Sequence, residues 1–164
     1  MIGVMAALSV PGLAETVLAR RARSIGPDEL VKRTLALVCT DPSRLSPEIV
    51  AAHLKLTRER ARLRSQNNRA FIQATRSIGL RMADPRFWAR ARKVKAPTLV
   101  VHGELDRVIP VAAARELVRR VRAWRLEVLE GVGHVPMMET PEAFSRVVKA
   151  FLADRIAPAP ATNP

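Results

Sequence analysis

A histidine and an aspartate near the carboxyl end are the residues best suited to do chemistry. His134 follows a Gly-Val-Gly run at residues 131–133, and Asp106 ends the Gly-Glu-Leu-Asp run of residues 103–106. A histidine can remove a proton and return it near neutral pH because its unperturbed pKa is about 6.5. A carboxylate that accepts the imidazole N–H fixes the tautomer and stabilises the imidazolium. His134 is therefore a candidate base, and Asp106 is a candidate acid that could orient it.

This acid and base lack a nucleophile in the chain. A serine nucleophile of this kind sits in a G-x-S-x-G elbow between a strand and a helix. Ser77 lies in the sequence Thr-Arg-Ser-Ile-Gly, which lacks the first glycine and a preceding strand. We therefore expect Ser77 to have no catalytic role.

The remaining histidines and the single cysteine are expected to be structural or exposed. His102 lies at a strand end and His53 in a predicted helix. Cys39 has no partner for an internal disulfide and follows an apolar helix face, which is typical of a packed small hydrophobe. The sequence contains no cluster of metal-ligand residues and no cofactor motif, so we expect neither a metal nor a cofactor.

Two strands must position the pair. Residues 98–102 form a short run with apolar residues on both faces, which predicts a buried parallel strand. Pro110 opens a helical pattern, and residues 125–129 predict the next strand, so the order is β-α-β. A last helix begins at residues 140–142, where Thr-Pro-Glu forms a typical helix start.

The region before Pro97 has helical periodicity. We expect an amphipathic helix over residues 27–38, a second helix from an N-cap at Ser46 to about Arg64, and a third over residues 71–82. A short fourth helix is expected around Phe87 and Trp88.

The motifs of the carboxyl half resemble a known family. Residues 97–110 read PTLVVHGELDRVIP, and residues 131–136 and 139–142 read GVGHVP and ETPE. This arrangement resembles the carboxyl end of cap-bearing α/β-hydrolases, in which an aspartate and a histidine after the last strands complete a triad. The resemblance assigns these roles to Asp106 and His134, and it favours Asp106 over Glu104 as the acid.

The resemblance implies an α/β fold with three parts. Residues 96–154 would form the carboxyl-terminal part of the sheet, with two strand–helix units. Residues 1–95 would form a basic, helical, cap-like segment, and residues 155–164 a Pro/Ala-rich tail. The implied activity is hydrolysis of a small apolar ester or related acyl substrate by a nucleophile–His–Asp mechanism. This chain alone is expected to be inactive, as a fragment.

The positive charge is concentrated outside the predicted site. Residues 1–95 carry 19 basic and 7 acidic side chains, whereas residues 96–154 carry 8 of each. A noncatalytic module that binds through the basic helices or an exposed sheet edge is therefore an alternative. A solvated helix face explains the charge better than nucleic-acid binding, because the chain has no Tyr and few other aromatic residues for base stacking.

Localisation and partners follow from the same observations. Residues 1–14 are apolar, but no Lys or Arg precedes them as a secretory signal requires. No apolar run is long enough to span a membrane. We expect a cytoplasmic protein. We also expect it to self-associate or to pair with an amino-terminal hydrolase half, because two strands alone leave an open edge. An in-frame upstream segment with a strand, a G-x-S-x-G elbow and a helix would favour the enzyme over the binding module.

Overall fold

The computed structural model describes residues 25–61 and 64–156. The chain divides into two compact units, one of Met1–Leu37 with Leu45–Lys95 and one of Val38–Arg44 with Ala96–Pro164. The segment compared with a secretory signal and most of the predicted tail lie outside the described residues. Residues 155 and 156 of that tail belong instead to the last helix.

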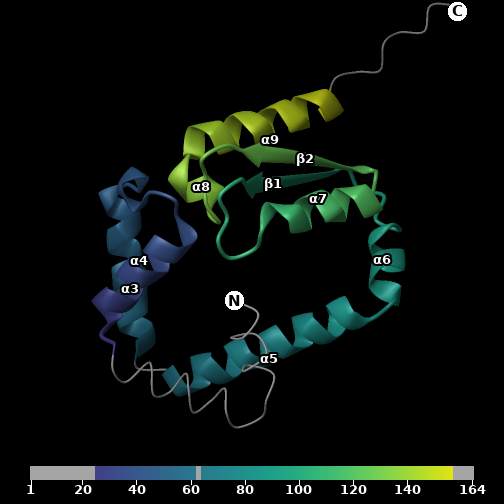
Figure 1. Ribbon diagram of the computed structural model, residues 1–164. Helices are drawn as coiled ribbons and strands as arrows, with labels where there is room; N and C mark the ends of the chain where they lie inside the picture. Colours follow the sequence, from purple (N-terminus) through teal and green to yellow (C-terminus); the bar gives the residue numbers. More distant parts are fainter. Residues whose placement is uncertain (1–24, 62–63, 157–164) are drawn as a thin grey trace, which may run out of the picture. The chain divides into compact units, whose positions relative to one another are not determined.

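Helices make up the described part of the first unit. The first of them, α3, begins at a proline, carries two acids in its first turn, and buries Val31 and Leu35 on one face. In α4 the Ser46 side chain accepts a hydrogen bond from the Ile49 N–H at 3.4 Å, which confirms the predicted N-cap. The helices, shown in Figure 1, are α3 (Pro27–Val38), α4 (Pro47–Arg60), α5 (Arg64–Ala83) and α6 (Arg86–Ala91).

The second unit is built on two parallel strands. Their register places Thr98 opposite Trp124 and Gly103 opposite Leu129. Helices α7 and α9 contact both strands and cover opposite sides of the sheet (Figure 1). The elements are β1 (Thr98–Gly103), α7 (Val111–Arg120), β2 (Trp124–Leu129), α8 (Pro136–Glu139) and α9 (Pro141–Ile156), and the 3-10 turn η1 (Pro42–Arg44) also belongs to this unit.

The predicted β-α-β order and the parallel pairing are confirmed, and four other features need correction. Helix α4 ends at Arg60 rather than near Arg64, and α5 begins at Arg64 rather than at residue 71. The one-turn helix α8 was not expected, although Pro136 at its first position is a helix-start signal. Strand β1 is half-buried over Thr98 to His102 rather than fully buried, because among the described residues only β2 pairs with it. None of the helices in the described ranges is both long and apolar enough to cross a membrane.

Two glycines let backbone segments of the second unit approach one another closely. A Cβ atom on Gly133 would lie 2.5 Å from the carbonyl oxygen of Val38 and 2.9 Å from the amide nitrogen of Thr40. A Cβ atom on Gly103 would collide with the carbonyl oxygens of Gly133 and Val132. The end of β1, the loop after β2 and the Val38–Arg44 segment therefore pack backbone against backbone.

This packing predicts opposite effects for two glycine-to-alanine changes. Gly133→Ala should destabilise the chain by about 1–3 kcal/mol, because the added methyl meets backbone atoms that cannot rotate away. Gly79→Ala, the matched control in α5, should be neutral or stabilising by up to about 1 kcal/mol, because its Cβ meets nothing within 4 Å and alanine favours a helix. Urea unfolding of both variants measures the difference. Equal stability of the two variants would contradict the packing argument.

Candidate active site

Asp106 and His134 lie close together at one edge of the small sheet. Asp106 follows the end of β1 by three residues, and His134 follows the end of β2 by five. Because the strands are parallel, both carboxyl ends lie at the same edge, where open α/β sheets place their ligands. The Nδ1 atom of His134 is 2.8 Å from Oδ2 of Asp106. The structure thus brings together the two residues selected from the sequence.

Both oxygens of the Asp106 carboxylate have hydrogen-bond donors. Oδ1 accepts from the amides of Val108 at 2.7 Å and Ile109 at 2.8 Å, so the loop wraps around the acid. The residue is only 8% exposed. Burial raises the pKa of Asp106, but hydrogen bonds from His134, Ile109 and Val108 outweigh it, so this pKa lies below its usual value. The carboxylate is therefore held in its ionised form.

The contact with Asp106 determines the tautomer of a neutral His134 ring. An ionised carboxylate only accepts hydrogen bonds, so the proton must lie on Nδ1. The lone pair is then on Nε2, the atom that can accept a proton from a nucleophile. One third of the His134 side chain is exposed, which leaves the ring accessible.

The two other histidines differ in their surroundings. His53 bonds the carbonyl oxygen of Ile49 in its own helix, in agreement with a structural or exposed role. His102 lies with Nε2 3.2 Å from Oδ2 of Asp106 and 2.9 Å from the carbonyl oxygen of Ile109. The sequence did not reveal this contact, although His102 and Asp106 flank the tight turn at the end of β1.

A buried carboxylate, Glu139, was not expected from the sequence. This residue ends α8 and is 2% exposed, and its carboxylate accepts hydrogen bonds from the amides of Thr40, Asp41 and Gly133. The Arg44 guanidinium lies 3.5 Å away. The sequence around Glu139 gives little signal of burial, because two of its three backbone donors, Thr40 and Asp41, lie about a hundred residues earlier.

Cys39 is a packed side chain, as predicted. It is 1% exposed. Burial raises the pKa of its thiol, and the negative charges of Glu139 and Asp41 raise it further. The thiol is therefore not activated as a nucleophile.

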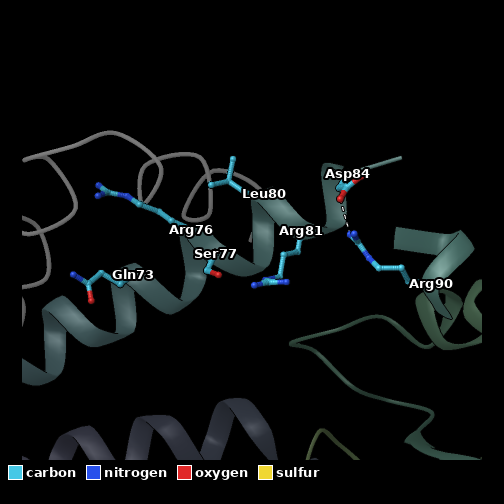
Figure 2. Close-up of a pocket in the computed structure, with 7 residues that line it drawn as sticks. All are labelled: Gln73, Arg76, Ser77, Leu80, Arg81, Asp84 and Arg90. Carbon is cyan, nitrogen blue, oxygen red and sulfur yellow. Dashed lines mark hydrogen bonds and ion pairs between the residues drawn. The ribbon is translucent and has the colours of Figure 1, made fainter. Parts of the chain in front are cut away.

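Ser77 is placed far from elbow geometry. It is exposed in the interior of α5 and lines a pocket of about 520 Å³ that contains no histidine. Figure 2 shows Arg76 and Leu80 on one side of α5 and Gln73, Ser77 and Arg81 on the other. Arg90 forms an ion pair with Asp84, and the guanidinium groups of Arg76 and Arg81 point in different directions. These arginines therefore do not form one anion site.

Several arginines of the helical unit are engaged with carboxylates. Arg58 forms two hydrogen bonds with Asp28, at 2.9 and 2.6 Å, which join α4 to α3, and Arg33 pairs with Glu29 on α3. Exposed pairs of this kind contribute little stability, but they lower the positive charge available to an acidic partner.

A comparison with protein families decides the assignment. A family model described as serine aminopeptidase, S33, matches residues 29–141, which is more than half of the chain. The chain belongs to this α/β-hydrolase family. Its two parallel strands and flanking helices are part of the α/β-hydrolase fold.

Individual relatives agree with the family. A 2-hydroxy-6-oxo-6-(2'-aminophenyl)hexa-2,4-dienoic acid hydrolase of Metapseudomonas resinovorans is 37% identical over 52% of this chain and 29% of its own length. A monoacylglycerol lipase of Rattus norvegicus is 38% identical over 37% of this chain and 18% of its own length. The solved structure of a thermophilic esterase from Thermogutta terrifontis (malate bound) has a TM-score of 0.61 at 20% identity and covers 90% of this chain and 53% of its own. The chain thus spans less than a third of the two curated relatives.

The lowered pKa of Asp106 predicts a pH dependence of stability. Because the folded pKa lies below the unfolded value of about 3.9, the stabilisation is complete above that value and is lost as the pH falls through the folded pKa. Asp106→Asn removes this titration and should cost about 1–3 kcal/mol at pH 7. Urea unfolding between pH 6 and about pH 2.5 should therefore show a smaller loss of stability for Asp106→Asn than for the parent chain. Parallel curves would contradict the assignment of this carboxylate.

Proposed function

We propose that this chain carries the base and the acid of a nucleophile–His–Asp hydrolase that cleaves a small apolar ester or related acyl compound. The observation that carries the proposal is the 2.8 Å contact between Nδ1 of His134 and Oδ2 of Asp106. Membership of a hydrolase family supports it. In this proposal residues 1–95 form the cap that helps to shape the substrate pocket.

The geometry suits a two-way proton transfer by His134. Nε2 takes the proton of the attacking nucleophile and later gives it to the leaving group. Asp106 stays ionised and stabilises the imidazolium formed between these steps. The nucleophile and the oxyanion donors must come from residues outside this pair.

Apolar residues adjacent to the pair in the sequence support an apolar substrate. Leu105 and Ile109 flank Asp106 in its loop, and Met137 follows His134 by three residues. Each is about half exposed, with exposed fractions of 47%, 47% and 49%. Large apolar side chains beside a polar pair are typical of pockets that bind an acyl or alkyl group. A monoacylglycerol lipase among the relatives also favours an ester.

Restoring a nucleophile tests the proposal. The chain is fused to an amino-terminal hydrolase segment that supplies a strand, a G-x-S-x-G elbow and a helix, and turnover of short-chain nitrophenyl esters is measured. His134→Ala should then reduce kcat by about 10³-fold or more, and Asp106→Asn should also reduce it strongly because the tautomer is lost.

Two controls accompany this experiment. His53→Ala, a change of an exposed histidine on α4, should leave turnover unchanged. The 164-residue chain alone should show no turnover above its own His134→Ala variant, because the pair has no acyl group to receive. Normal kinetics in a folded His134→Ala fusion would remove His134 from the mechanism.

We also propose that the open sheet edge is covered by a second chain or by an amino-terminal hydrolase half. Among the described residues β1 and β2 pair only with each other, and an unpaired strand edge is a template for another strand. Light scattering should therefore show self-association of the chain alone, and addition of an amino-terminal half should replace it with a mixed complex. A dilute monomer with strong amide protection at residues 99–101 and along β2 would contradict this prediction.

A further inference from the structure

We infer that Glu139 is a positioning residue for His134, an inference that rests on the proposed function. Its carboxylate joins the loop that carries His134 to the Val38–Arg44 segment. Glu139 lies one helical turn beyond His134, at the end of α8, and its side chain is fully buried.

The carboxylate of Glu139 binds two different segments. Oε2 accepts the Gly133 N–H at 2.8 Å and the Thr40 N–H at 3.1 Å. Oε1 accepts the amides of Thr40 and Asp41, each at 3.0 Å. A buried carboxylate is costly unless hydrogen bonds replace its hydration, and three backbone donors do so here. Glu139 therefore fixes the distance between the Gly133 peptide and the start of η1.

The next peptide is tied to the same segment directly. The His134 N–H donates to the carbonyl oxygen of Val38 at 2.6 Å. The Gly133 amide is thus joined to the Val38–Arg44 segment through Glu139, and the His134 amide is bound to that segment directly. These two hydrogen bonds hold the loop against the segment. Because Gly133 has no Cβ atom, the two backbones can lie this close together.

Arg44 supports the same arrangement from the surface. Its Nη1 atom lies 3.1 Å from the carbonyl oxygen of Gly131 and 3.5 Å from Oε1 of Glu139. Three residues of the loop at 131–134 are therefore held in place. Gly131 binds Arg44, Gly133 binds Glu139, and His134 binds Val38. With the backbone of His134 held in place, its ring remains within hydrogen-bond distance of Asp106.

The role of Glu139 can be tested on the 164-residue chain without turnover. Glu139→Gln keeps the shape of the side chain but replaces one acceptor oxygen with an NH₂ group, which cannot accept a hydrogen bond from an amide. We expect amide exchange at Gly133 and His134 to become about tenfold faster or more. We also expect the Nδ1–H signal of His134 to weaken or disappear in nitrogen-15 NMR spectra.

Two matched variants separate positioning from a general loss of stability. Val121→Ala removes buried methyl groups before the start of β2, at the end of the strand opposite the His134 loop. It should lower the Tm while leaving the Nδ1–H signal intact. Glu142→Gln changes an exposed glutamate at the start of α9 and should alter neither measurement.

Two results would overturn the inference. One is a Glu139→Gln chain with the exchange rates and Nδ1–H signal of the parent. The other is complete loss of the β1 and β2 signals in this variant, which would assign Glu139 to the folding of the whole unit. The measurement reads the imidazole rather than turnover, so its outcome is distinguishable from a failure of the proposed hydrolase activity.

Discussion

The close approach of three backbone segments is the constraint on which the geometry of the second unit depends. Glycines at positions 103 and 133 allow the end of β1, the loop after β2 and the Val38–Arg44 segment to meet without intervening side chains. The Leu105 N–H then donates to the carbonyl oxygen of Val132, which joins the acid loop to the base loop. Because backbone atoms have few ways to relax, this contact limits where Asp106 and His134 can lie.

The two buried carboxylates of this unit are stabilised by donors of different origin. Asp106 takes its amide donors from Val108 and Ile109 in its own loop, so its environment is largely local in sequence. Glu139 takes two of its donors from Thr40 and Asp41. Both arrangements satisfy a buried charge with N–H groups. Only the first can be recognised from neighbouring residues, because a turn around an aspartate is a local pattern.

The sequence predicted most accurately where local signals determine structure. The bounds of α3, the N-cap at Ser46 and the β-α-β order depend on periodicity and capping, and all agree with the structure. The end of α4 was less accurate because no glycine or proline marks it. The contact of His102 with Asp106 and the burial of Glu139 depend on tertiary packing. No periodic pattern contains that information.

The second unit contains the contacts that fix the acid–base pair described above. Val38, Thr40, Asp41 and Arg44 belong to it together with Ala96–Pro164, although that short segment lies within a region predicted to be cap-like. The contacts described for this pair therefore lie within one unit. This separates two properties of the proposed enzyme. The orientation of His134 depends on one unit, whereas the choice of substrate depends on the groups that face its Nε2, including the nucleophile.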